Sequence, residues 1–188
     1  MIIINSNKKL KIVCLGDSIT YGFPFGPEAS WVTMLKQVLI DADVINEGIN
    51  GDTTSDMLRR FESSVLKHNP THLIIMGGAN DVICAESFAR IVWNLEEMIN
   101  KALSAGIEVI IGIPTPVEEP YWEKLIERIR TWMFDYAHKN KLKVINFAAA
   151  FYDENGQLKN ELLLGDGGHP DIKGYQQMFK QISLDIFT

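Results

Sequence analysis

The sequence predicts an α/β protein, a three-layer α/β/α sandwich in which a five-stranded parallel sheet carries helices on both faces. Short β-branched runs alternate with segments of helical periodicity along the whole chain. Hydrophobic residues make up 46% of the 188 residues and charged residues 22%, which is typical of a globular protein with a substantial core. No repeat, low-complexity tract or linker divides the chain, so residues 1–188 are predicted to form one domain.

Five short apolar segments, rich in Val, Ile and Leu, are predicted to be strands. The third is apolar throughout and breaks at Gly77-Gly78, as a buried central strand of a parallel sheet does. The predicted strands cover residues 11–15, 44–46, 73–76, 109–113 and 142–146.

Helical periodicity separates these strands. In the clearest helix, apolar residues recur at helical spacing from Phe88 to Leu103, and Gly106 follows where a C-terminal cap belongs. N-capping residues at 53–56 precede another helix, whose Leu58 and Phe61 share a face. The expected helices cover residues 31–39, 53–65, 88–103, 122–136 and 170–186.

Prolines mark the remaining boundaries. Pro114, Pro116 and Pro120 are expected to hold a loop after the fourth strand. Pro170 is expected at the first position of the last helix, where its missing N–H costs nothing.

Charge and composition exclude several classes of partner. The net charge is −6 and no Lys/Arg run is present, which argues against nucleic-acid binding. No segment approaches the ~18 consecutive apolar residues of a membrane span. The apolar residues 1–4 are interrupted before the hydrophobic region of a secretory signal forms, and Cys14 and Cys84 have no disulfide or metal-binding spacing. A cytoplasmic protein with reduced thiols is therefore expected.

Residues capable of acyl transfer follow the predicted strands. Ligands of open parallel sheets bind beyond the carboxyl ends of the strands. Ser18 follows the first strand, Gly51 the second and Asn80 the third, while Asp166 and His169 precede the last helix. These turns are therefore expected to meet at one edge of the sheet.

The residue types suit a nucleophilic mechanism. A serine hydroxyl becomes a nucleophile when a base removes its proton, and a neutral imidazole titrating near pH ~6.5 is a suitable base. Asp166 lies three residues before His169 and can reach the ring nitrogen that does not face the serine. The backbone N–H groups of Ser18 and Gly51 and the side-chain amide of Asn80 are the available donors for an oxyanion.

The turns contain four sequence blocks that resemble the conserved blocks of a known protein family. In chain order the blocks are Gly16-Asp17-Ser18-Ile19, residues 46–53, Gly78-Ala79-Asn80-Asp81 and Asp166-Gly167-Gly168-His169-Pro170, followed by Gly174-Tyr175. Together they resemble the SGNH hydrolases, also called the GDSL esterase/lipase family. A lone Gly-Asp-Ser would be a weak signal, whereas four blocks in the family's order are specific.

The resemblance implies a flavodoxin-like sheet over nearly the whole chain and hydrolysis of esters or thioesters without a metal or organic cofactor. Carried over residue by residue, it makes Ser18 the nucleophile, His169 the general base and then acid, and Asp166 the orienting carboxylate. It also makes Ser18, Gly51 and Asn80 the oxyanion hole.

Five residues are candidates for the substrate pocket: Asp17, Tyr21, Phe23, Tyr121 and Gly168. Gly168 stands where relatives usually carry an aliphatic residue, which predicts a roomier site beside His169. The aromatic residues lie in short loops stiffened by proline, and each alone is equally well explained as an anchor for its loop. These loops predict a modest, open pocket.

Other interpretations stay open for some of these residues. Ser18 alone reads as a helix N-cap. Five aspartates near the strand ends suggest a hard-metal site: Asp17, Asp52, Asp81, Asp166 and Asp171. The serine, histidine and asparagine at the same edge have no role in such a site, and turn chemistry also explains Asp17, Asp52 and Asp81. No metal site is therefore predicted.

The predicted function is a serine esterase that cleaves small or short-chain carboxylic esters through an acyl-enzyme on Ser18. Acetyl esters of carbohydrates are among the candidate substrates. A lysophospholipase or acyl thioesterase of the same family, or a non-catalytic ligand-binding domain with this fold, are the alternatives. A small-molecule ester is the expected partner. A homodimer stays open, because helical periodicity does not distinguish a core face from an interface.

Overall fold

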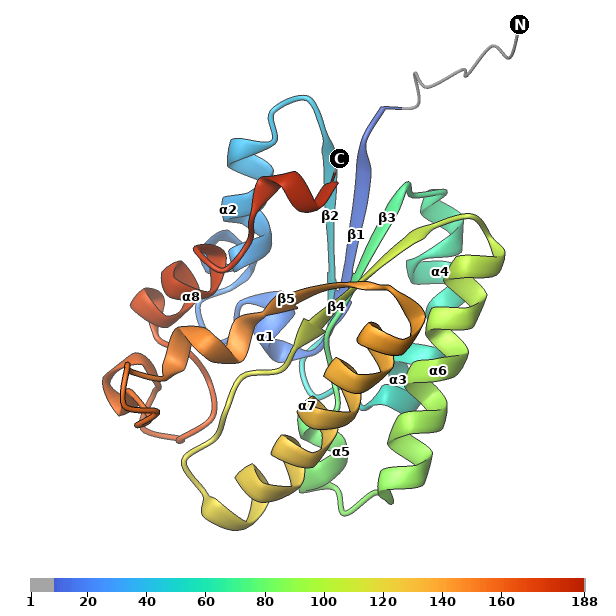
Figure 1. Cartoon of the computed structure of the whole chain (residues 1–188). Helices are drawn as coiled ribbons and strands as arrows, with labels where there is room; N and C mark the ends of the chain where they lie inside the picture. The colour runs from blue at the N-terminus through green and yellow to red at the C-terminus, as the bar shows by residue number, and fades with distance from the viewer. Residues whose placement is uncertain (1–8, 188) are drawn as a thin grey trace, which may run out of the picture.

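An all-parallel sheet of five strands in the order β2-β1-β3-β4-β5 forms the middle layer of the molecule (Figure 1). The computed structural model describes residues 9–187, so residues 1–4 lie outside the described part of the chain. The order is flavodoxin-like, which confirms the predicted fold class and all five predicted strands. The strands are β1 (Lys11–Gly16), β2 (Asp43–Gly48), β3 (His72–Ile75), β4 (Glu108–Ile113) and β5 (Lys143–Asn146).

The register of the strands brings their carboxyl ends to one edge. Gly16 of β1 pairs with Gly48 of β2, and Leu15 pairs with Ile75 of β3. The strand order reverses at β1, so the topological switch point lies between β1 and β3, where ligands bind in open α/β sheets. The loops after these two strands therefore start side by side.

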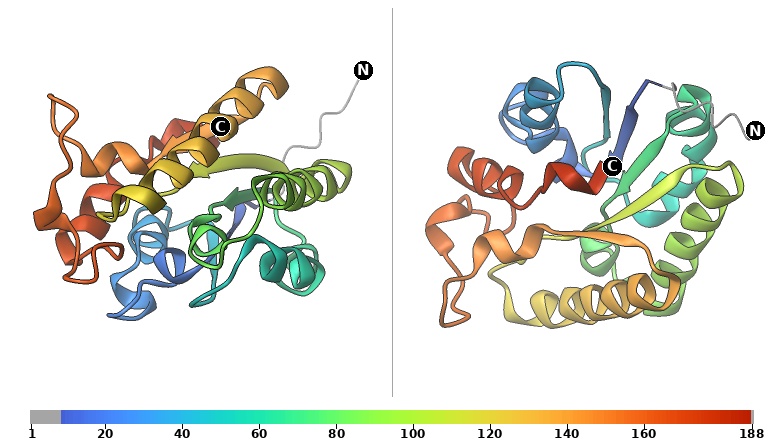
Figure 2. Two further views of the ribbon diagram at one scale, coloured as in Figure 1. Left: turned by 90° about the horizontal axis from the view of Figure 1, so that it is seen from below. Right: turned by 45° about the horizontal axis from the view of Figure 1, so that its top comes forward.

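Helices cover both faces of the sheet (Figure 2). Successive residues of β1 face opposite layers: Ile12 and Cys14 pack on one side, and Val13 and Leu15 on the other. The first side holds α2 (Trp31–Val38) and α8 (Ile172–Phe179). The second side holds α3 (Thr54–Arg59), α4 (Phe61–Ser64), α6 (Phe88–Ser104) and α7 (Pro120–Asn140).

The helix expected over 53–65 is divided into two, which corrects the sequence prediction. Thr53 caps α3 in a capping box with Asp56, as its position suggested. At Arg60 the backbone takes φ −95° and ψ 7°, which ends α3 and begins α4. The Arg60 side chain turns to the sheet edge, where its long-range hydrogen bonds are made. Helical periodicity continued through this break because Leu58 and Phe61 both pack against the core.

The sequence predictions for two prolines were also wrong. Pro120 begins α7 rather than extending the loop, since its missing N–H and fixed φ suit the first helical position. Pro170 lies outside α8: it pairs with Leu163 in an isolated bridge, and Asp171 caps the helix by accepting a hydrogen bond from the Gly174 N–H. The helix ends at Phe179, earlier than predicted.

Within residues 9–187, no helix is both long and apolar enough to cross a membrane. The single domain, the homodimer and the cytoplasmic location stay predictions.

Gly48 allows the end of β2 to approach the short helix α1 (Ser18–Tyr21). A Cβ at Gly48 would lie 2.2 Å from the Tyr21 backbone nitrogen. We expect Gly48→Ala to lower the free energy of unfolding by ~1–3 kcal/mol in urea denaturation, because the backbone must shift to relieve the overlap. Gly165→Ala is the control, since a Cβ there meets no described atom within 4 Å. Equal stability of the two variants would contradict the predicted effect.

Candidate active site

Ser18, His169 and Asp166 form a chain of hydrogen bonds at the carboxyl edge of the sheet. The Ser18 Oγ lies 2.9 Å from the His169 Nε2, although the two residues are 151 positions apart. The His169 Nδ1 lies 2.7 Å from the Asp166 Oδ2. A hydroxyl next to an imidazole that is held by a carboxylate can lose its proton to the ring. The structure thus brings together the three residues predicted to act as nucleophile, base and orienting carboxylate.

The position of Ser18 depends on Asp17. Asp17 is the N-cap of α1, and its Oδ1 accepts a hydrogen bond from the Ile19 N–H at 2.9 Å. The capping role left open for Ser18 therefore belongs to its neighbour, and the Ser18 hydroxyl faces His169. Burial raises the pKa of Asp17 to about 6, against the lowering effects of the Ile19 N–H and the His169 ring. This candidate pocket residue lies buried beside the hydrogen-bond chain.

Asp166 organises the loop that holds His169. Its Oδ1 accepts hydrogen bonds from the backbone N–H groups of Gly168 and His169, both at 3.0 Å. Partial burial raises the pKa of Asp166, but these two bonds and the His169 ring outweigh it, so the pKa lies below its ordinary value. The carboxylate is therefore ionised at neutral pH, as an orienting partner of a histidine must be.

The predicted oxyanion donors lie in two linked segments. Gly51, in the turn after β2, has φ +82°, a conformation that glycine adopts without strain. Asn80 lies in α5 (Ala79–Ile83), and its Nδ2 donates to the Asp52 carbonyl oxygen at 2.9 Å. The Ile49 N–H donates to the Gly16 carbonyl oxygen. The turn after β2 is thereby fixed to α5 on one side and to β1 on the other.

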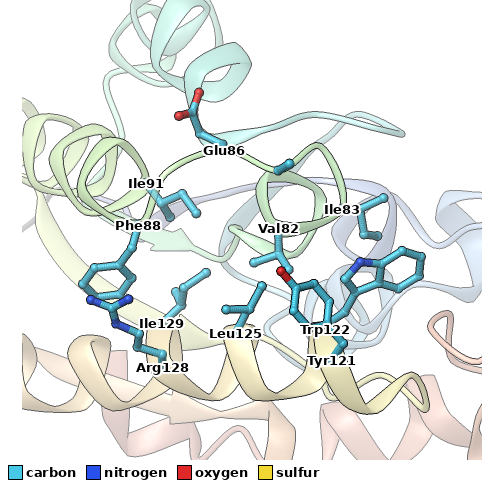
Figure 3. Close-up of a pocket in the computed structure, with 11 residues that line it drawn as sticks. Val82, Ile83, Glu86, Phe88, Ile91, Tyr121, Trp122, Leu125, Arg128 and Ile129 are labelled. Atoms are coloured by element: carbon cyan, nitrogen blue, oxygen red, sulfur yellow. The ribbon is translucent and has the colours of Figure 1, made fainter.

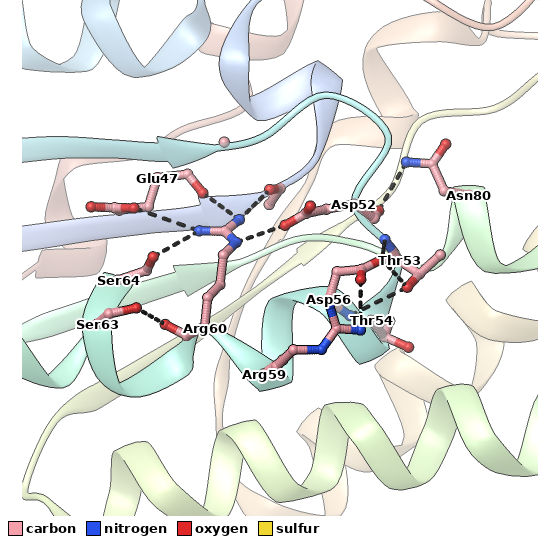
Figure 4. A network of polar contacts seen from close by, with 12 residues as sticks. Glu47, Asp52, Thr53, Thr54, Asp56, Arg59, Arg60, Ser63, Ser64 and Asn80 are labelled. Atoms are coloured by element: carbon pink, nitrogen blue, oxygen red, sulfur yellow. Dashed lines mark hydrogen bonds and ion pairs between the residues drawn. The ribbon is translucent and has the colours of Figure 1, made fainter.

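Arg60 connects the ends of β1 and β2 (Figure 4). Its Nη2 donates to the carbonyl oxygens of Gly16 and Glu47 at 3.0 and 2.9 Å, and its Nε lies 2.6 Å from the Asp52 Oδ2. Nη1 donates to the Ser64 Oγ. Sequence reasoning missed this residue, because one arginine in an amphipathic helix reads as a solvated charge. Arg60 and these four partner groups are together called the Arg60 clamp below.

The other carboxylates at the strand ends also have protein partners. Asp52 pairs with Arg60, and the buried Asp81 accepts hydrogen bonds from the N–H and hydroxyl groups of Thr54. Burial raises the pKa of Asp81 against these hydrogen bonds. Asn94 of α6 donates to the Thr54 Oγ1. The aspartates that suggested a hard-metal site thus fix loops.

A cleft of about 470 Å³ opens beside His169. The Glu118 N–H donates to the Gly167 carbonyl oxygen at 2.7 Å, so the loop after β4 is held against the histidine loop. Gly168 lines the cleft, and a Cβ there would meet only Val117, at ordinary contact distance. The lining consists of Ile83, Val117, Glu118, Glu119, Trp122, Gly165, Asp166, Gly167, Gly168 and His169.

The aromatic candidates lie in different places. The Phe23 ring centroid is 4.6 Å from that of His169, and the Tyr175 hydroxyl donates to the Phe23 carbonyl oxygen. Tyr21 is half-buried in α1 against β2. Tyr121 is exposed and lines a second cavity next to the cleft, whereas its neighbour Trp122 lines both. Among these side chains, Phe23 packs against the His169 ring and Trp122 lines the cleft beside it.

A flavodoxin-like sheet with a Ser–His–Asp hydrogen-bond chain at its carboxyl edge has the architecture of a hydrolase. The chain belongs to the GDSL-like Lipase/Acylhydrolase family, whose model matches residues 14–177. It is 29% identical over 164 residues to an arylesterase of Vibrio mimicus, which covers 85% of this chain and 80% of the relative. It is 26% identical over 176 residues to Esterase TesA of Pseudomonas aeruginosa, covering 91% and 85%.

Solved structures give the same result. The lipase/acylhydrolase from Enterococcus faecalis matches with a TM-score of 0.82 and 29% identity, over 95% of each chain. The protein is therefore a hydrolase acting on carboxylic esters, and the alternative of a non-catalytic binding domain is set aside.

Truncation of Arg60 leaves Asp52 without its cation and removes one donor each from the carbonyl oxygens of Gly16 and Glu47. The Arg60 and Asp52 side chains are 14% and 12% exposed. We expect Arg60→Ala to lower the free energy of unfolding by about 3–5 kcal/mol, measured by urea denaturation. Arg59→Ala is the matched control and should cost less than ~1 kcal/mol, because Arg59 is 75% exposed in its ion pair with Asp56. Similar losses in both variants would contradict a special role for Arg60.

The raised pKa of Asp17 gives stability a defined pH dependence. The folded protein holds the Asp17 proton up to about pH 6, whereas the unfolded chain releases it near the ordinary value for aspartate. Ionised Asp17 therefore destabilises the fold above pH 6, and the penalty disappears as the pH falls toward 4. We expect Asp17→Asn, which keeps an acceptor for Ile19, to be more stable than wild type by about 3 kcal/mol at pH 8. Denaturation across pH 4–8 measures this, and a pH-independent difference would contradict it.

Proposed function

We propose that this chain is a serine esterase that cleaves small or short-chain carboxylic esters through an acyl-enzyme on Ser18. The observation that carries the proposal is the hydrogen-bond chain from Ser18 through His169 to Asp166, with distances of 2.9 and 2.7 Å. A binding protein would have no use for a serine in contact with an imidazole that a carboxylate orients.

In the acylation step, the His169 Nε2 takes the hydroxyl proton as the Ser18 Oγ attacks the carbonyl carbon. Asp166 accepts the Nδ1–H and stabilises the imidazolium that forms. The oxyanion accepts hydrogen bonds from the N–H groups of Ser18 and Gly51 and from the second N–H of the Asn80 amide. His169 then protonates the leaving alcohol. Water repeats the sequence on the acyl-enzyme and releases the acid.

The shape of the cleft supports a small substrate. The apolar Val117 and Trp122 side chains lie beside the carboxylates Glu118 and Glu119, so the cleft has contacts for a short apolar group and for hydroxyl groups. Acetyl esters of carbohydrates carry both. The relative from Vibrio mimicus is an arylesterase, which supports the use of aryl esters as first substrates.

Hydrolysis of p-nitrophenyl acetate, butyrate and octanoate by wild type, Ser18→Ala and Asn80→Ala tests the proposal. We expect wild type to prefer acetate or butyrate to octanoate, and Ser18→Ala to abolish turnover. Asn80→Ala should lower kcat on the order of 10²–10³-fold, because it removes one oxyanion donor.

Ser63→Ala is the control for a serine substitution, since this exposed hydroxyl bonds only the Arg60 carbonyl oxygen among the described residues. It should keep wild-type activity. Turnover that survives Ser18→Ala would overturn the serine mechanism. Faster turnover of acyl thioesters or lysophospholipids than of any short ester would favour the thioesterase or lysophospholipase alternative.

A further inference from the structure

A second cavity, of about 220 Å³, lies between α5, α6 and α7, next to the catalytic cleft (Figure 3). Most of the side chains around it are aliphatic or aromatic, and they converge from three helices. The lining consists of Val82, Ile83, Ala85, Glu86, Phe88, Ile91, Tyr121, Trp122, Leu125, Arg128 and Ile129.

Two side chains line both the cleft and this cavity. Ile83 is the last residue of α5 and Trp122 lies in the first turn of α7. Figure 3 shows them together at one end of the cavity, with Phe88 at the other. Ile83 and Trp122, called the partition below, therefore lie where the space beside His169 meets the apolar space behind it.

The cavity suits an apolar ligand. Val82, Ile91 and Ile129 are buried in its wall. The Arg128 guanidinium lies 3.8 Å from the centroid of the Phe88 ring, so its charge rests on an aromatic face. A dry apolar cavity of ~150 Å³ is large enough to hold benzene, so this one has room for a chain or ring of six carbon atoms.

Ile83 of the partition lies about one helical turn from Asn80, a proposed oxyanion donor. Asn80 and Ile83 are three residues apart in α5, so their side chains share one face of the helix. Ile83 also lines the cleft beside His169, so acyl carbon atoms that extend into the cleft from an ester bound at Asn80 would reach Ile83. Each added methylene extends toward the partition, and the cavity continues the path beyond it.

We infer that the cavity is an apolar subsite for the far end of an acyl chain, and that Trp122 and Ile83 determine acyl-chain specificity by closing it to the wild-type cleft. The inference rests on the proposed function, which supplies the acyl-enzyme on Ser18. It explains why a protein with apolar volume close to its nucleophile would still prefer short esters.

The test is the chain-length profile of kcat/KM on p-nitrophenyl esters from acetate to decanoate. In Trp122→Ala the two spaces join, and we expect the ratio of octanoate to acetate hydrolysis to rise about tenfold or more, since apolar groups gain a site. Ile83→Ala should shift the ratio the same way. Trp122 and Ile83 are 37% and 49% exposed and lie outside the buried core, so the variants are expected to fold.

A refilling variant separates a subsite from a general disturbance. Leu125 lines the second cavity and not the cleft. Adding Leu125→Phe to Trp122→Ala should return the octanoate-to-acetate ratio toward wild type, because the new ring occupies the opened space. Trp93→Ala, which truncates a tryptophan exposed elsewhere on α6, is the matched control and should leave the ratio unchanged.

The outcomes distinguish the two proposals. Unchanged ratios in Trp122→Ala and Ile83→Ala, with active acetate hydrolysis, overturn this inference alone. A wild-type protein inactive on every ester overturns the proposed function and the inference with it. A gain on octyl acetate in place of p-nitrophenyl octanoate would show that the cavity takes the alcohol group, which overturns the acyl assignment. If Trp122→Ala fails to fold in a thermal denaturation assay, Ile83→Ala decides the question.

Discussion

The carboxyl edge of the sheet depends on the hydrogen bonds and the ion pair of the Arg60 guanidinium. The Gly16 carbonyl oxygen at the end of β1 and the Glu47 carbonyl oxygen near the end of β2 lie beside the Asp52 carboxylate, and a buried charge without a partner is costly. Arg60 donates to one carbonyl oxygen from each strand and to the Asp52 carboxylate. A planar group with several fixed donors suits this arrangement, whereas a lysine ammonium would not. The segments that carry Ser18 and Gly51 are thus held to each other, and the Asn80 side chain joins them through its hydrogen bond to the Asp52 carbonyl oxygen.

Further contacts fix the loops on the opposite side of the cleft. Glu123 of α7 accepts from the Val117 N–H and the Tyr152 hydroxyl and pairs with Arg130. The loop after β4 is thereby attached to α7 through Val117 and to the histidine loop through Glu118. A cleft built from such loops has its hydrogen-bonding groups in place before a ligand arrives. Catalysis by oriented dipoles requires this, because reorganisation during the reaction would cost free energy.

The parts that could be predicted from the sequence are those decided locally. An apolar run such as 73–76 predicts a strand without knowledge of its neighbours in the sheet. In a parallel sheet the turns after the strands lie at one edge, so Ser18 and Asn80 could be placed there without knowledge of the strand order. The break at Arg60 could not be predicted, because its side chain reaches carbonyl oxygens that are distant in the sequence. Gly16 lies 44 positions before Arg60, and Glu47 lies 13 positions before it. Pro120 and Pro170 were ambiguous for a related reason: a proline fits a loop, a helix start or a bridge, and tertiary contacts decide which.

The distance of 151 positions between Ser18 and His169 has a consequence for the order in which the molecule is made. The proposed nucleophile leaves the ribosome well before its proposed base, which lies just ahead of α8. The hydroxyl of Tyr175 in that helix bonds the Phe23 carbonyl oxygen, so docking of α8 fastens the histidine loop near the nucleophile. Until then the nascent chain holds a serine without a base. Under the proposed mechanism, reactivity is therefore withheld from the growing polypeptide and appears when the histidine loop and α8 fold into place.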